Sequence, residues 1–271
     1  MCWSGCTDGN FVSADGDILH GRRPLIVRKR RRDDALIARL KMRGARPLEV
    51  PVMRMGAPDP VHQAAAEQVF QQLQDYTMAA FISPYVAELV LAELERRHLQ
   101  LAPACHCLAV GQGTAAVLRD AGYEVTAPGL DMTSEGLLEM SQLADLSGEN
   151  IVIFRGEGGR RVMDQAFVQR GARITSCLLY RREPDLDQRD SLLQAVRENA
   201  FDAVVVHSGE LLSHMAALLP DDALAQVLRY PLVVPHARVA DKARDLGAEQ
   251  VEIACNASTD AIEAALAQCY S

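Results

Sequence analysis

Short apolar runs alternate with amphipathic stretches along almost the whole chain. Residues 151–154 form a typical run of four apolar, mostly β-branched residues, which predicts a buried parallel strand. A glycine-rich turn at 155–160 follows, then a helical stretch at 161–169 that stops at Gly171, and then a second predicted strand at 174–180. Because strands and helices keep alternating in this way, the sequence predicts an α/β fold with parallel sheets.

This strand–helix–strand unit has an earlier copy in the chain. Residues 25–28 match the first strand, a helix through Leu40 follows, and Arg43-Gly44-Ala45-Arg46 matches Arg170-Gly171-Ala172-Arg173. Further matches come in the same order at a nearly constant offset: Phe81-Ile82-Ser83 with Val206-His207-Ser208, Arg119-Asp120-Ala121-Gly122 with Arg244-Asp245-Leu246-Gly247, and Ser134-Glu135 with Thr259-Asp260. We interpret the series as an internal duplication that gives two similar α/β lobes.

The same patterns place the remaining elements. We expect strands at 79–82, 108–110, 203–206, 232–234 and 251–254, helices at 59–74 and 84–97, and helices that begin near Ser134 and Ser258. The proline-punctuated residues 46–53 are expected to be extended.

Composition and charge narrow the class of protein. The 271 residues are enough for two domains, and 49% of them are hydrophobic, which is typical of a globular chain. No apolar run reaches the length of a membrane span, and the polar residues 1–23 lack a secretory pattern, so we expect a flexible N-terminal extension and a cytoplasmic location without membrane contact. The net charge of −8 argues against nucleic acid as a partner.

The cysteines and the basic run give no clear site. The tightest cysteine cluster, Cys105-His106-Cys107, has the wrong spacing for a zinc knuckle, so we expect reduced thiols and no metal. The basic run at 28–32 fits either a solvated charged turn or a loop that faces an anion. The sequence leaves both interpretations open.

Two glycine loops invite a nucleotide-binding interpretation. Gly111-Gln112-Gly113-Thr114 lacks the third glycine of a dinucleotide fingerprint, and the loop at 155–160 lacks the Lys-Ser/Thr of a P-loop.

Ser83 before Pro84 is a good helix cap, and a helix start with free N–H groups can also hold a carboxylate.

Taken in order, the motifs resemble the uroporphyrinogen-III synthase family over nearly the whole chain after Pro24. They are Val27-Arg28, Phe81-Ile82-Ser83-Pro84, Val110-Gly111-x-Gly113-Thr114-Ala115, Ser134-Glu135-Gly136-Leu137-Leu138, Arg155-Gly156-x-Gly158-Gly159-Arg160, Arg170-Gly171-Ala172, Tyr180-Arg181-Arg182 and Ser208-Gly209-Glu210. The resemblance implies a lyase of heme biosynthesis that cyclises hydroxymethylbilane to uroporphyrinogen III, with inversion of ring D and loss of water. It implies no metal or organic cofactor. We expect a monomer and a transient hand-over of substrate from porphobilinogen deaminase.

The resemblance also orders the two lobes along the chain. Lobe 1 would be discontinuous, with residues 24–49 and 183–271, and lobe 2 would span 54–174. A two-stranded extended linker, residues 50–53 and 175–182, would join them.

A polycarboxylate substrate needs N–H groups and cations to bind it. The candidate substrate-binding residues are Arg28, Ser83, Gly113, Thr114, Ser134, Arg155, Gly156, Gly158, Ser208, Gly209, His236 and Arg238. His236 and Arg238 enter because many relatives have hydroxyl residues in that turn and this chain has none. Tyr180 is the candidate catalytic proton donor, since a phenol of ordinary pKa stays protonated at neutral pH, although a structural tyrosine fits the same pattern.

Two other classes of function fit the same architecture. One is a two-lobed small-molecule binding or sensor protein without chemistry. The other is a nucleotide-dependent transferase that uses the loop at 155–160.

Overall fold

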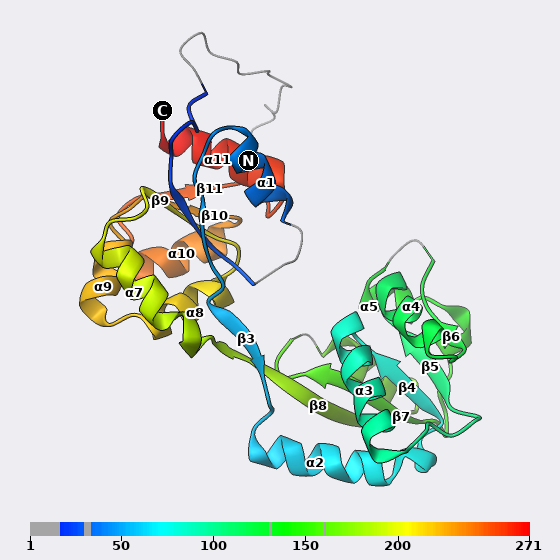
Figure 1. The fold of residues 1–271 in the computed structure, drawn as a ribbon. Helices are drawn as coiled ribbons and strands as arrows, with labels where there is room; N and C mark the ends of the chain where they lie inside the picture. The colour runs from blue at the N-terminus through cyan, green and yellow to red at the C-terminus, as the bar shows by residue number, and fades with distance from the viewer. Residues whose placement is uncertain (1–16, 30–33, 130–131, 160) are drawn as a thin grey trace. The chain divides into compact units, whose positions relative to one another are not determined.

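The computed structural model describes residues 17–29, 34–129, 132–159 and 161–271 (Figure 1). It divides into two compact units: unit 1 combines the chain up to Arg54 with Glu183–Ser271, and unit 2 is Met55–Arg182. Among the described residues, no helix is long and apolar enough to cross a membrane.

Unit 1 is built on a five-stranded sheet with strand order β11-β10-β9-β1-β2, and its strand pairs are parallel. Its elements are β1 Pro24–Val27, α1 Ala35–Met42, β2 Leu48–Val50, α7 Arg189–Arg197, β9 Ala203–Val206, α8 Gly209–Leu218, α9 Asp221–Val227, β10 Leu232–Val234, α10 Ala237–Asp245, β11 Val251–Ile253 and α11 Thr259–Cys269.

Successive side chains of each central strand pack on opposite faces of this sheet. In β1, Leu25 and Val27 join the core under α7 to α10, whereas Ile26 joins the core under α1 and α11. Because both faces are covered, the strands are apolar throughout, which is why they could be found from short apolar runs.

Unit 2 contains the six-stranded sheet β3-β8-β7-β4-β5-β6. Its elements are α2 Pro60–Gln71, β4 Met78–Phe81, α3 Pro84–Arg97, β5 His106–Ala109, α4 Gln112–Asp120, β6 Val125–Thr126, α5 Ser134–Leu138, β7 Asn150–Gly156 and α6 Val162–Gln169, with β3 Met53–Gly56 and β8 Arg173–Pro184 each extending into unit 1. Phe81 and Phe154 pack under α2, α3 and α4, and Ile151 and Ile153 pack against α5 and α6.

The strand orders of the two units agree with an internal duplication. Reading from the same edge, β11-β10-β9-β1-β2 corresponds to β6-β5-β4-β7-β8. The strand that carries residues 25–27 therefore has the same place in its sheet as the strand that carries 151–154, as the sequence matches predict.

Two expected segments differ in the structure. Residues 175–178 pair in parallel with residues 152–155 of β7, so this part of the expected linker is a strand of the sheet. Within the expected N-terminal extension, Leu19 is fully buried in the core beside α1 and α11, so this part of residues 17–23 packs on unit 1. Residues 1–16 lie outside the described part of the chain.

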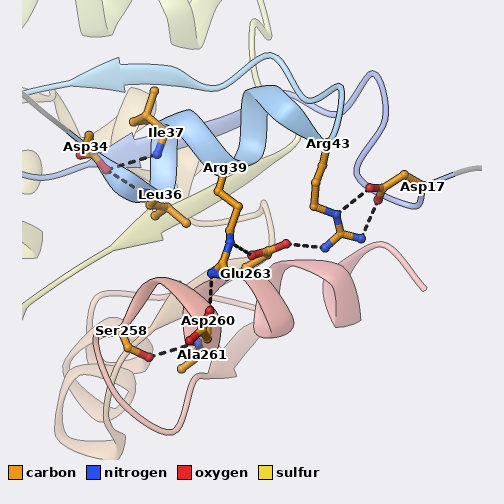
Figure 2. Close-up of polar contacts among 10 residues, drawn as sticks. All are labelled: Asp17, Asp34, Leu36, Ile37, Arg39, Arg43, Ser258, Asp260, Ala261 and Glu263. Carbon is orange, nitrogen blue, oxygen red and sulfur yellow. Dashed lines mark hydrogen bonds and ion pairs between the residues drawn. The ribbon is translucent and has the colours of Figure 1, made fainter. Parts of the chain in front are cut away.

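Figure 2 shows the polar contacts that hold this packed segment. Arg43, the C-cap residue of α1, binds both carboxylate oxygens of Asp17, with Nε–Oδ2 and Nη2–Oδ1 distances of 2.6 and 2.7 Å, and also binds Glu263 in α11. Arg39 joins Glu263 and Asp260. The network therefore ties the N-terminal segment and α1 to the last helix of the chain.

Candidate functional site

The carboxyl ends of β4 and β7, together with the middle of β8, form one edge of unit 2. Parallel pairing of β4 with β7 and of β7 with β8 sets the residues after these strands close together, as expected for ligand sites in open α/β sheets. A pocket of about 170 Å³ opens at this edge. Its lining residues are Ile82, Ser134, Ile153, Arg155, Gly156, Gly158, Gly159, Met163, Asp164, Tyr180 and Arg182.

The pocket thus brings together five of the residues proposed from the sequence: Ser134, Arg155, Gly156, Gly158 and Tyr180. Sites that enclose a whole drug-sized ligand usually have about 300–1,000 Å³. This pocket is smaller, so it can take only a part of a large ligand, such as one ring or its side chains.

Gly156 and Tyr180 are in direct contact. A Cβ atom on Gly156 would lie 2.3 Å from Tyr180 Cζ, so only glycine leaves room for the ring. The ring also packs edge-on against Tyr85, with 5.2 Å between ring centroids and 74° between ring planes. The backbone N–H of Glu157 donates to the backbone carbonyl oxygen of Tyr180 at 2.7 Å. Tyr180 is buried but lines the pocket, and no described residue hydrogen-bonds its hydroxyl group.

Arg155 is held inside unit 2. Its Nη1 donates to Asp164 Oδ2 at 2.7 Å and its Nη2 to the carbonyl oxygen of Gly158 at 3.2 Å, and only 6% of the side chain is exposed. The sequence predicted a cation at this strand end, and the structure adds that an aspartate compensates its charge. Arg160, at the end of the same loop, lies outside the described residues.

A second polar group holds the other side of the glycine loop. Glu157 Oε1 accepts from the backbone N–H of Asp59 at 3.0 Å and lies 3.2 Å from His62 Nδ1. In the described part of the chain these three side chains alone have potential metal ligand atoms close together, within 4.8 Å of one another. They bind one another at the start of α2, outside the pocket lining, and so fix the loop to that helix.

The other expected residues of unit 2 have mainly structural contacts. Ser83 caps α3 by accepting from the N–H of Val86 at 3.3 Å, as predicted. Gly111 is the N-cap of α4, so Thr114 lies inside the helix and is buried. Gly113 lets α4 pack on Pro84, whose Cγ would be 3.3 Å from an added Cβ.

α5 begins at Ser134, as expected. Thr133, and not Ser134, is the N-cap, and its hydroxyl accepts from the N–H of Gly136 at 3.0 Å. The Thr133 backbone is extended, so its side chain can reach back over the first turn. Ser134 is left with its side chain in the pocket lining.

In unit 1, the candidate residues follow three neighbouring strands, β1, β9 and β10, and so lie at one edge of the five-stranded sheet. Ser208 caps α8 by accepting from the N–H of Leu211 at 3.2 Å. His236 is the N-cap residue of α10 without a side-chain cap bond, and both it and Arg238 are exposed. Of the basic run, Arg28 is described and Arg30 to Arg32 are not.

Arg28 and Gly209 have contacts that the sequence did not predict. Arg28 is 8% exposed and forms an ion pair with Asp34, the N-cap of α1. Lys242 in α10 donates to the carbonyl oxygen of Gly209 at 2.9 Å and to the hydroxyl of Ser213. The lysine fastens the first turn of α8 to α10.

Sequence reasoning missed Asp164, Tyr85 and Arg182 as parts of the pocket environment. Arg182 belongs to a motif that was recognised, so its position in β8 could have placed it near Tyr180. Asp164 and Tyr85 sit in the first turns of helices that follow strands, but their side chains reach the site only through the tertiary fold.

The five described cysteines are free, as expected. Burial raises the pKa of Cys105 to about 11 and that of Cys107 to about 12, so both thiols stay protonated at neutral pH. Free and largely buried thiols agree with the interpretation of this cluster as reduced, structural cysteines.

Comparisons with known proteins agree with the motifs. The family model for uroporphyrinogen-III synthase HemD matches residues 34–263. The uroporphyrinogen-III synthase of Salmonella typhimurium is 29% identical over 248 residues, covering 89% of this chain and 98% of that protein, and the one of Escherichia coli is 28% identical over 246 residues, covering 89% and 98%.

Solved structures agree on the fold. A mutant uroporphyrinogen III synthase from Thermus thermophilus aligns with a TM-score of 0.54 at 19% identity, covering 92% of this chain and 98% of that one. The uroporphyrinogen-III synthetase from Helicobacter pylori aligns with a TM-score of 0.50 at 15% identity, covering 91% and 99%. These findings do not favour a binding protein without chemistry. From the ordered motifs, the repeated strand order and the match over most of its length, the chain belongs to the uroporphyrinogen-III synthase family, an enzyme family of lyases in heme biosynthesis.

Proposed function

We propose that the chain closes hydroxymethylbilane to uroporphyrinogen III with inversion of ring D, and that Tyr180 donates the proton with which the hydroxymethyl oxygen leaves as water. The position of the Tyr180 side chain in the pocket is the observation that supports its role as the proton donor. The ring lies against Gly156 and Tyr85, the N–H of Glu157 donates to the backbone carbonyl oxygen of Tyr180, and the hydroxyl group has no hydrogen bond to any described residue.

Closure with inversion of ring D breaks two bonds between heavy atoms and forms two. The carbon–oxygen bond of the hydroxymethyl group breaks as a proton is transferred to the oxygen, and the pyrrole nitrogen lone pair stabilises the resulting cation. The ring D α-carbon that already carries the bridge to the neighbouring ring attacks this cationic carbon, and its old bond to the bridge carbon then breaks. The bridge carbon, now cationic, is attacked by the other α-carbon of ring D, which loses its proton to restore the aromatic ring. A positioned phenol can supply the first proton, and such acid assistance is worth about 10²–10⁴-fold in rate.

Inversion depends on how ring D is held. The substrate carries carboxylates on every ring, so recognition falls to N–H groups, hydroxyl groups and cations. Within unit 2 we propose Ser134, Gly156 and Gly158 as direct contacts, because they line the pocket, with Arg155 shaping it. We propose that three further residues stabilise this edge of the sheet: Ser83, which caps α3, and Gly113 and Thr114, which pack within α4.

Within unit 1 we propose Ser208, Gly209, His236 and Arg238 as substrate contacts. They lie at the carboxyl ends of the adjacent strands β9 and β10, where two helices begin and N–H groups point outward. The exposed His236 and Arg238 add groups that can bind carboxylates. Arg28, one strand further, would support this edge through its pair with Asp34.

A coupled assay tests the function. Porphobilinogen deaminase generates the bilane, the protein is added, and the oxidised porphyrins are separated by isomer. We expect the type III isomer to dominate with the protein and the type I isomer to dominate without it. Type I product in the presence of folded protein would exclude the proposed activity.

We further propose that the chain works as a monomer in the cytoplasm, receives its substrate from porphobilinogen deaminase, and connects lobe 1 (24–49 with 183–271) to lobe 2 (54–174) through residues 50–53 and 179–182. Sedimentation velocity, with and without the deaminase, would measure the monomer and any hand-over complex.

A further inference from the structure

The pocket contains one acidic side chain, Asp164, that the proposed chemistry does not use. It projects from the first turn of α6, and 16% of its side chain is exposed. Both carboxylate oxygens are engaged: Oδ2 accepts from Arg155 Nη1 at 2.7 Å, and Oδ1 accepts from the hydroxyl of Ser176 at 2.9 Å. One carboxylate therefore links β7, α6 and β8.

Arg155 in turn binds the glycine loop. While Asp164 holds one end of the guanidinium group, Nη2 of Arg155 donates to the carbonyl oxygen of Gly158 at 3.2 Å. Gly158 has a φ of +76°, a conformation that favours glycine. Because glycine adopts many other conformations equally well, contacts such as this one help to keep the loop in its shape. Gly156, near the start of the same loop, is in contact with the Tyr180 ring.

Charge explains why the aspartate is needed. A buried guanidinium group is stable only if a counter-charge and hydrogen-bond acceptors replace the water that it has lost. With Asp164 and the Gly158 carbonyl in place, the group is compensated inside the protein. Without Asp164 the guanidinium would be drawn toward solvent or toward the carboxylates of a substrate.

Unit 1 contains the same kind of pair. Arg28 follows β1, which has the place in its sheet that β7 has in unit 2, and it pairs with Asp34 at the start of α1. The exposed fractions of these side chains are 9% and 7%. The two aspartates stand at different spacings from their arginines, so the pairing recurs although the sequence around it has changed.

We propose that Asp164, oriented by Ser176, is a positioning residue of the synthase reaction. It keeps Arg155 on the Gly158 carbonyl and thereby holds the glycine loop, and with it the Tyr180 ring, in the geometry for reaction. Arg155 then serves as a fixed part of the pocket wall and not as a mobile ligand for substrate carboxylates. This inference rests on the proposed role of Tyr180.

The test compares steady-state kinetics and product isomers of the full chain in its wild-type form and in the variants Asp164→Ala, Asp164→Asn, Arg155→Ala and the double variant Asp164→Ala/Arg155→Ala. If Asp164 acts through Arg155, each single change lowers kcat by about 10- to 100-fold, as expected for a misplaced reacting group, and the double variant is no worse than the poorer single one. Multiplying losses in the double variant would overturn the proposal.

A matched control and a rescue separate positioning from general stability. Asp145 is an exposed carboxylate of the same unit that accepts from the N–H of Ser147 at 2.9 Å, so Asp145→Asn should leave kcat and KM unchanged. Ser176→Ala should lower kcat less than Asp164→Ala, and Ser176→Thr, which restores a hydroxyl group, should recover most of the loss. A merely structural role would lower the melting temperature in these variants without this pattern in kcat.

The isosteric Asp164→Asn keeps the test decisive if Asp164→Ala does not fold. A folded Asp164→Asn variant with wild-type kcat would overturn the inference. If the wild-type protein itself yields no type III isomer, the proposed function fails. If it does and the Asp164 variants match it, the positioning role alone fails.

Discussion

The contact between Gly156 and Tyr180 allows a sharp prediction for Gly156→Ala. An added Cβ would lie 2.3, 2.6 and 2.7 Å from three carbon atoms of the Tyr180 ring. Carbon atoms in contact prefer about 3.5–4.0 Å, so the ring or the loop must move by about 1 Å or more. Gly156 is not among the glycines with positive φ, so the effect comes from this clash and not from backbone strain.

Two losses follow from the displacement. Overpacking of this kind costs about 1–3 kcal/mol of stability, because Tyr85 packs against the ring and the hydrogen bond from Glu157 N–H to the backbone carbonyl oxygen of Tyr180 fixes the backbone. A misplacement of about 1 Å at a reacting group can lower the rate about 10²-fold. We therefore expect a folded protein with a lower melting temperature and a kcat about 100-fold below the wild type.

The coupled isomer assay measures the rate, and thermal unfolding followed by circular dichroism measures the stability. Gly129→Ala is the matched control, since Gly129 belongs to the same unit and an added Cβ there would meet nothing within 4 Å. A folded Gly156→Ala variant with wild-type turnover would show that the position of the Tyr180 ring does not matter to the reaction, and the reasoning would be refuted.

Three further predictions follow from other contacts. Tyr180→Phe keeps the packing but loses the hydroxyl group, so turnover should fall about 10²-fold or more while the product stays type III; normal turnover would leave Tyr180 structural. The hydrogen bond from Arg43 lowers the pKa of Asp17, so their pair stabilises the fold above the unfolded pKa of about 3.9 and is lost as the pH falls through the folded pKa. The melting-temperature difference between wild type and Asp17→Asn, corresponding to about 0.2–1 kcal/mol at pH 7, should therefore vanish on acidification, and a constant difference would contradict the ion pair. Ser208→Ala and Ser258→Ala each remove an N-cap and should each cost about 1 kcal/mol, but only Ser208→Ala should also raise KM; equal KM values would leave Ser208 a cap alone.

The sequence by itself determined the fold class and the order of the elements. Strands such as β1 and β9 are covered on both faces, so each is a short run of apolar residues that can be recognised without the structure. The duplication was visible because equivalent positions in two similar units keep similar turns and caps, such as Ser83 and Ser208. Local chemistry also fixed the stop at Gly171, whose φ is +94°.

Only the tertiary structure decided which of the candidate residues lie together and what charge each one presents. The sequence indicates that Arg28 and Arg155 are cations at strand ends. In the structure the charge of each is compensated by an aspartate, and no sequence pattern predicts how many residues separate the two partners. The fit of Tyr180 on Gly156, residues of neighbouring strands, depends on the irregular register at the end of β7. Hydrophobic periodicity reports which way a residue faces relative to the core. Ion pairs and close contacts between elements depend on distances of a few ångströms, and packing sets those only when the whole unit has formed.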